Sequence, residues 1–169
     1  QQSESSNKAF ITKCQSAEFG SNLWEIGTMN KTWNLQIAKP SSGCDAGGAT
    51  WEAEQNVAVL VTRGGCSFGE KSLMLQKRGA KLVIIVNNDD SLFAMGVDDF
   101  GQKVSVPVLL ISQATSAKLA ALDAGIGTMD NVNVLFRLSA PVGANPFADS
   151  SSSHQGTSVR DAGMHWTLP

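Results

Sequence analysis

The chain is poor in the residues that metal sites, nucleic-acid surfaces and membrane spans require. Its 169 residues include two histidines and three cysteines, and 13 basic residues against 15 acidic ones give a net charge of −2. Without a basic stripe to neutralise phosphates, nucleic acid is not an expected partner. No segment approaches the roughly 18 uninterrupted apolar residues of a membrane span. We therefore expect membrane attachment only through a transmembrane helix outside this chain.

The cysteines and acidic residues do not form a recognisable metal motif. Cys14, Cys44 and Cys66 are far apart and make neither a C-x-x-C pair nor a cysteine–histidine cluster, so zinc is not indicated. The four aspartates between residues 89 and 99 lack the spacing of a calcium loop. We expect no metal and no cofactor. An oxidising compartment would allow one disulfide and leave one thiol over.

Two features are typical of a secreted or lumenal protein. Residues 1–6, QQSESS, look like the polar stub that follows a removed signal peptide. Asn30 begins an N-x-[ST] sequon, N-K-T, and is the expected glycosylation site. The predicted compartment is the cell exterior or the lumenal side of the endomembrane system.

Composition and length predict one globular domain with tails. Hydrophobic residues make up 42% of the chain and charged residues 17%, which is ordinary for a fold with a real core. We expect a flexible stub at 1–8 and the domain at 9–138. A polar, Gly/Ser-rich tail follows at 139–169, whose last apolar residues, 164–168, are the candidate for docking back onto the domain.

The hydrophobic pattern predicts strands that alternate with two helices. Short apolar or alternating runs bounded by turn residues indicate strands. Apolar residues at steps of four, three and four indicate a helix from Phe68 to Gly79. A second helix is expected to begin at Ser112 or Thr115 and to run through Leu122. The expected strands are 8–14, 33–38, 57–61, 82–86, 104–111 and 131–138.

A possible catalytic motif lies between the third strand and the first helix. Residues 65–69, GCSFG, fit the G-x-S-x-G nucleophile elbow of serine hydrolases, with Ser67 as the nucleophile. Such a serine needs a histidine base within hydrogen-bond reach. The only histidines, His154 and His165, are both in the C-terminal tail, a poor scaffold for a base. We therefore expect no catalytic residue and no enzyme, and a Ser67 hydrolase is the remote alternative.

The same residues predict a binding rim. Gly64 and Gly65 suit a tight turn, and the helix N-terminus after them presents backbone N–H groups beside Arg63, an arrangement that attracts a carboxylate or a peptide terminus. The loop at 87–96, NNDDSLFAMG, follows the next strand and has two readings. It is either a recognition loop, or a solvated turn whose Phe93 and Met95 fold back onto the core.

These segments together resemble the protease-associated (PA) domain family. The resemblance lies in V-L-V-T-R-G-G-C-S-F-G-E-K at 59–71, the helix end and strand at 76–87, the loop at 88–96 and V-P-V-L-L-I-S at 106–112. Upstream, A-E-F-G at 17–20 and the segment from Pro40 to Cys44 are similar to the entry hairpin of the family. The likeness covers roughly residues 9–138.

The resemblance implies a fold, a disulfide and a role. It implies an α+β swivelling β/β/α fold, a β-rich sandwich or open barrel with two short flanking helices. It implies a Cys44–Cys66 disulfide, with Cys14–Cys44 as the rival. It also implies a non-catalytic domain that binds peptide segments of cargo or substrate proteins, as in vacuolar sorting receptors and membrane-anchored RING ubiquitin ligases. The alternative role is a regulatory or structural module of a larger protease. The residues expected to contact the peptide are Arg63, Gly64, Gly65, Cys66, Ser67, Asp89, Asp90, Ser91, Leu92, Phe93 and Met95.

Overall fold

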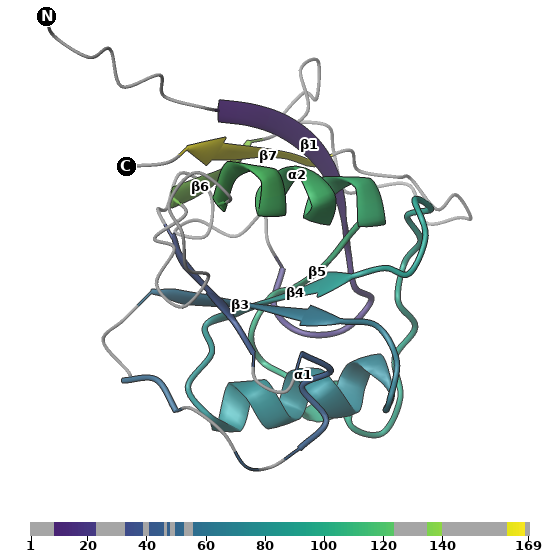
Figure 1. The fold of residues 1–169 in the computed structure, drawn as a ribbon. Helices are drawn as coiled ribbons and strands as arrows, with labels where there is room; N and C mark the ends of the chain where they lie inside the picture. Colours follow the sequence, from purple (N-terminus) through teal and green to yellow (C-terminus); the bar gives the residue numbers. More distant parts are fainter. Residues whose placement is uncertain are drawn as a thin grey trace, which may run out of the picture.

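In the part of the chain that the structure describes, seven strands close into a barrel flanked by two α-helices (Figure 1). The computed structural model describes residues 9–22, 33–38, 41–45, 47, 50–52, 56–123, 135–139 and 162–167. The strands are β1 (Ala9–Ser16), β2 (Trp33–Ile37), β3 (Val57–Thr62), β4 (Leu82–Val86), β5 (Val108–Ile111), β6 (Leu135–Ser139) and β7 (Ala162–Thr167). The helices are α1 (Phe68–Lys77) and α2 (Gln113–Asp123), with a short 3₁₀ turn, η1, at Gly101–Lys103.

The barrel combines a parallel half with an antiparallel half. The strand order is β1-β5-β4-β3-β2-β6-β7. Strands β2 to β5 pair in parallel, whereas β1, β6 and β7 pair antiparallel to their neighbours. Every residue of β4 and β5 is buried, as expected for parallel strands covered on both faces. The α+β class predicted from the sequence is therefore confirmed.

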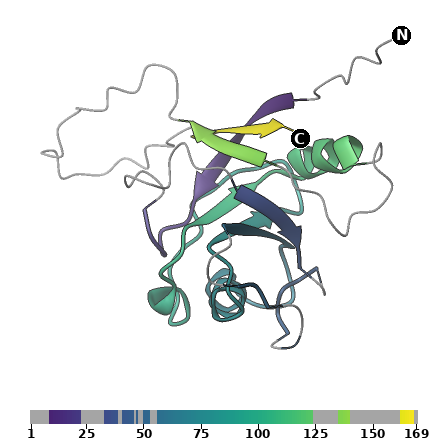
Figure 2. The same cartoon turned by 90° about the vertical axis from the view of Figure 1, so that its left-hand side faces the viewer.

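The hydrophobic core lies between the parallel strands and helix α1. Alternate residues of β3 and β4 point into this core and pack against Leu73 and Leu75 of α1. Helix α1 and strand β7 lie at opposite ends of the molecule in both views (Figures 1 and 2). The strands therefore hold α1, and the turn that leads into it, on the side of the barrel opposite β7.

The start of β5 differs from the sequence prediction. An extended strand was expected from Val104, but β5 begins at Val108, directly after Pro107. The amide of Val104 instead closes the 3₁₀ turn by donating to the carbonyl of Gly101. Pro107 has no N–H for a ladder but its carbonyl accepts from Val83. It therefore stands at the start of an interior strand.

The barrel includes a strand from the C-terminal segment. Strand β7 pairs with β1 over Ala9–Cys14 and with β6 over Leu135–Ser139, so the sheet continues beyond residue 138. Residues 164–167, the candidate for docking, lie within β7. Asn30, the stub at 1–8 and His154 lie outside the described residues. No helix in the described ranges is long and apolar enough to cross a membrane.

Candidate functional site

The predicted rim forms where two adjacent parallel strands end. Thr62, the last residue of β3, is the register partner of Val86, the last residue of β4. The next residues, Arg63 and Asn87, therefore emerge side by side. The amide of Arg63 donates to the carbonyl of Val86, and the amide of Asn87 donates to the carbonyl of Ile111 on β5, both at 2.9 Å. Backbone pairing thus fixes both residues at the carboxyl end of the sheet.

The exposed side chain of Arg63 contacts two aromatic rings. Its guanidinium carbon lies 5.6 Å from the ring centroid of Phe68 and 5.3 Å from that of Phe93. The two rings are 5.9 Å apart and tilted by 57°. Cation–π contacts of this length stabilise the orientation of a guanidinium. Phe68 comes from α1 and Phe93 from the loop after β4, so Arg63 joins these two segments.

Two asparagines also bind the guanidinium of Arg63. Nη1 donates to Oδ1 of Asn87 at 2.9 Å and to Oδ1 of Asn88 at 3.4 Å. Within the described part of the chain, Nε and Nη2 have no acceptor, and the side chain is exposed. A guanidinium has five N–H donors in a planar fork. Those on Nε and Nη2 are available to a carboxylate of a ligand.

Asn87 is the centre of the loop that follows β4. It is 2% exposed, and its Nδ2 donates to Oδ1 of Asp89 and to the carbonyl of Ser91, both at 2.9 Å. Its Oδ1 accepts from Arg63 and from the amide of Asn88. A buried amide with all these partners satisfied fixes the loop in one conformation.

The aspartates of this loop are engaged with the protein itself. The carboxylate of Asp89 accepts from the amide and hydroxyl of Ser91, and these bonds, together with the charge of Arg63, lower the pKa of Asp89. Oδ1 of Asp90 accepts from the amide of Ala114, and the carbonyl of Asp89 accepts from the amide of Gln113. The loop therefore supplies acceptors to amides in the first turn of α2. The helix itself provides no partners for these amides. Within the described ranges, no group of three His, Cys, Asp or Glu residues could hold a metal ion.

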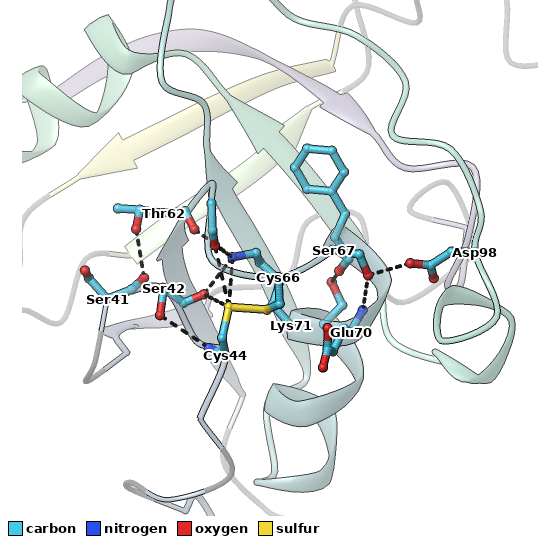
Figure 3. The surroundings of a disulfide bond; sticks show 12 residues. Ser41, Ser42, Cys44, Thr62, Cys66, Ser67, Glu70, Lys71 and Asp98 are labelled. Atoms are coloured by element: carbon cyan, nitrogen blue, oxygen red, sulfur yellow. Dashed lines mark hydrogen bonds between the residues drawn. A yellow bond between two sulfur atoms is a disulfide. The ribbon is translucent and has the colours of Figure 1, made fainter.

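The opposite wall of the rim is the glycine turn, which the Cys44–Cys66 disulfide joins to residues 41–45 (Figure 3). This confirms the pairing that the resemblance implied. Gly64 and Gly65 have φ angles of 110° and 83°, which side chains other than glycine rarely adopt. A Cβ on Gly65 would also lie 2.9 Å from Sγ of Cys44. Cys14 takes no part in the disulfide, and its burial raises the pKa of the thiol to about 12.

Lys71 binds the same turn from its buried side. Although it belongs to α1, its side chain is completely buried. Nζ donates to the carbonyls of Ser42 at 2.7 Å, Thr62 at 3.0 Å and Gly64 at 2.8 Å. Burial lowers the pKa of Lys71, and the neighbouring Glu70 partly opposes this shift. One ammonium group therefore joins the 41–45 segment, the end of β3 and the glycine turn.

Ser67, the residue at the centre of the G-x-S-x-G match, caps helix α1. Its Oγ accepts from the amide of Glu70 at 3.1 Å and donates to Oδ2 of Asp98. The bond from Glu70 is that of an N-cap residue, and the bond to Asp98 joins the cap to the loop before η1. His165 lies on β7, at the end of the molecule opposite α1 (Figures 1 and 2). Among the described residues, Ser67 therefore acts as the cap of helix α1.

All but one of the predicted peptide-contacting residues are exposed or half-buried. Arg63, Gly64, Gly65, Ser67, Asp89, Asp90 and Ser91 are exposed, while Cys66, Leu92 and Phe93 are half-buried. Met95 is completely buried in the core, where its carbonyl accepts from the amide of Glu18. Met95 therefore follows the alternative reading, in which this residue folds back onto the core. Leu92 and Phe93 also pack against that core with part of their surface.

Five residues that organise this site were not among those predicted to contact a peptide. They are Asn87, Asn88, Phe68, Lys71 and Asp98. Asn87 carried a usable signal, because a polar residue directly after a buried parallel strand lies at the carboxyl edge of the sheet. Lys71 is the last residue of the motif at 59–71, but its burial was not expected, since a lysine on a predicted helix ordinarily faces solvent.

Known proteins are similar to this chain over the region that contains the site. A family model described as PA domain matches residues 31–119. Signal peptide peptidase-like 3 of Arabidopsis thaliana is 28% identical over 127 residues, covering 74% of this chain and 22% of that protein. Aminopeptidase YwaD of Bacillus subtilis (strain 168) is 39% identical over 64 residues, covering 38% of this chain and 14% of that protein.

Solved structures add a zinc aminopeptidase, BSAP from Bacillus subtilis. Its TM-score is 0.49 at 19% sequence identity, over 82% of this chain and 36% of that chain. The present chain spans about a fifth or less of the length of the curated relatives that it matches.

Proposed function

The chain belongs to the PA domain family, and from this premise we propose that it is a non-catalytic protein-interaction domain. Its ligand is a peptide segment of a cargo or substrate protein, which it binds for sorting or recruitment. The peptide lies across the rim between the glycine turn and the loop at 87–93. Arg63 is the central contact, with a carboxylate of the peptide as its partner.

The single observation that supports this proposal most is the state of Arg63. Its guanidinium is fixed by Phe68, Phe93 and Asn87, but Nε and Nη2 have no acceptor within the described residues. A preorganised cation at a surface loses little side-chain entropy when a ligand binds. Two exposed glycines beside it let a peptide backbone approach closely.

The proposed location is the cell exterior or the lumen of the endomembrane system. The Cys44–Cys66 disulfide supports an oxidising compartment. Glycosylation at Asn30 is part of the same proposal. An intact-mass measurement on protein secreted from eukaryotic cells, before and after amidase treatment that removes N-linked glycans, tests whether Asn30 carries a glycan.

The binding proposal is tested with a displayed library of random peptides. Selected peptides are synthesised, and their Kd values are measured by calorimetry for the wild-type protein, Arg63→Glu and Lys77→Glu. Lys77 is an exposed cation at the far end of α1, so its reversal changes the net charge equally without touching the rim. Loss of a charge-assisted hydrogen bond predicts at least about tenfold weaker binding for Arg63→Glu alone. A library that yields no binder, or equal effects of both variants, would refute the proposal.

A second role is supported by the comparisons. The matched relatives are named as a signal peptide peptidase-like protein and an aminopeptidase, and this chain spans a small part of each. The chain would then be a regulatory or structural module of a larger protease and bind no peptide by itself. The coding sequence after residue 169 distinguishes the roles, because a peptidase domain in the same reading frame favours the accessory module.

A further inference from the structure

The buried ammonium of Lys71 lies beside one of the two disulfide sulfurs. Nζ is 3.7 Å from Sγ of Cys44, and Figure 3 shows it next to the S–S bond. Three carbonyls surround the same nitrogen, at 2.7 to 3.0 Å. A neutral amine has only two N–H donors, whereas an ammonium has three. The three acceptors therefore require the charged form of Lys71.

This charge has no carboxylate partner among the described residues. Among these residues, the acidic group that acts on it is Glu70, its neighbour in sequence. A buried cation without a counter-ion favours the appearance of a negative charge nearby. If the disulfide opens, a thiolate on Cys44 would supply that charge at contact distance.

The two sulfurs also differ in their surroundings. Sγ of Cys44 is covered by Nζ of Lys71 on one side and by the backbone of Gly65 on another, where a Cβ would come within 2.9 Å. Cys44 and Cys66 are both half-buried, and each has an exposed neighbour in sequence, Asp45 beside Cys44 and Gly65 beside Cys66. Residue exposure therefore does not distinguish the two cysteines, whereas the position of Lys71 does.

We propose that the Cys44–Cys66 bond is a directed thiol-exchange site, at which a small thiolate attacks Cys66 and Cys44 leaves as the thiolate. The attacking sulfur forms a bond to Sγ of Cys66, the Cys44–Cys66 bond breaks, and its electron pair remains on Cys44 beside Lys71. A second thiolate then attacks the external sulfur of this mixed disulfide, and Cys66 leaves as the thiolate. The two external thiols are thereby oxidised to a disulfide and both cysteines are reduced. The better-stabilised thiolate is the better leaving group.

Cys66 is thus the modification site, and low-molecular-weight thiols are the class of reagent. This inference does not depend on peptide binding, because it concerns only the chemistry of the disulfide and Lys71. It also assigns opposite fates to two cysteines that the sequence alone does not distinguish.

The first experiment locates the adduct. Folded, oxidised wild-type protein is treated briefly with 2-mercaptoethanol and quenched in acid, which stops exchange because the thiolate is the reactive species. Digestion with pepsin in acid and mass spectrometry then assign the mixed disulfide to a peptide. We expect the adduct mainly on the Cys66 peptide. An adduct on Cys44, or one divided equally between them, would overturn the proposal.

The second experiment separates the charge of Lys71 from simple access. Alkylation rates with iodoacetamide are measured for Cys44 in the Cys66→Ser variant and for Cys66 in the Cys44→Ser variant. At about pH 6 we expect Cys44 to react several-fold faster, because a lysine beside a thiol raises its thiolate fraction. At about pH 8.5 the advantage shrinks or reverses, because an ordinary thiol is then substantially ionised and is the stronger nucleophile. A ratio that does not change with pH would reflect access alone and would contradict the role of Lys71.

Substitution of the lysine provides the matched control. Lys71→Met in the Cys66→Ser background should remove the advantage of Cys44 at low pH, whereas Lys77→Met and the charge-retaining Lys71→Arg should keep it. Should Lys71→Met fail to fold, the peptide assignment on wild-type protein and the pH dependence of the single-cysteine variants still decide the question.

Discussion

Nη1 of Arg63 donates a 2.9 Å hydrogen bond to Oδ1 of Asn87, which joins an exposed cation to a buried amide. The two residues follow adjacent parallel strands, so the bond exists because β3 and β4 end in register. Asn87 also holds Asp89, whose carbonyl pairs with the first turn of α2. The orientation of Arg63 therefore depends on the loop after β4 and, through it, on α2.

Replacement of Asn87 tests this dependence. Asn87→Ala should lower the free energy of unfolding by about 1–3 kcal/mol, because it leaves buried partners without hydrogen bonds. Asn88→Ala is the control, since Asn88 is exposed and contacts Arg63 only at 3.4 Å. Urea denaturation of both variants provides the comparison. Equal losses would show that the buried amide does not organise the loop.

The buried ammonium of Lys71 should be one of the strongest single contributions to the stability of the rim. Lys71→Met leaves the carbonyls of Ser42, Thr62 and Gly64 without their donor, and we expect a loss of at least about 2 kcal/mol, the scale of a hydrogen bond to a charged group. Lys77→Met, on the exposed side of the same helix, should be nearly neutral. Thermal and urea unfolding measure both. An unchanged midpoint for Lys71→Met would contradict the prediction.

Helix α1 approaches the loop before η1 so closely that only glycine fits at position 69. A Cβ on Gly69 would collide with Oδ1 of Asp98 and with the amide nitrogen of Gly101. Gly69→Ala should therefore cost about 1–3 kcal/mol, as overpacking does. Gly47→Ala is the matched control, because nothing lies within 4 Å of the position of its added Cβ. Similar unfolding midpoints for the two variants would show that the contact is not tight.

The sequence predicts the parts of this structure that depend on local pattern. Strand β4 has the expected limits, 82–86, because a continuous apolar run ends at turn residues on both sides. Helix α1 is expected from its apolar spacing. Its cap at Ser67 was not predicted, although Ser67 and Glu70 fit the S-x-x-E pattern of a helix start. The same serine also fits a hydrolase motif, so a local pattern alone leaves its role ambiguous.

Contacts between distant residues are not predictable in this way. Ser67 and Asp98 are 31 residues apart, and Arg63 and Asn87 are 24 apart. Met95 looks like an exposed apolar residue in an acidic loop. It is buried because the loop is held against the segment after β1, where the amide of Glu18 donates to the carbonyl of Met95. Such placements depend on strand register and on loop closure, and a single sequence specifies neither directly.

Acid should weaken the link between α1 and the loop before η1. The hydroxyl of Ser67 and the backbone amide of Gly101 stabilise the charged carboxylate of Asp98, so the pKa of this group is lower in the folded protein than its ordinary value of 3.8. A group with a lowered folded pKa contributes stability above its unfolded pKa and loses this contribution as the pH falls through the folded one. We expect wild type to be more stable than Asp98→Asn at neutral pH and the difference to close below pH 3.8. Asp99→Asn, at an exposed neighbour, should not show this convergence, and urea midpoints across the pH range measure all three proteins. A gap that stays constant from neutral to acid pH would mean that the carboxylate charge of Asp98 does not stabilise the fold.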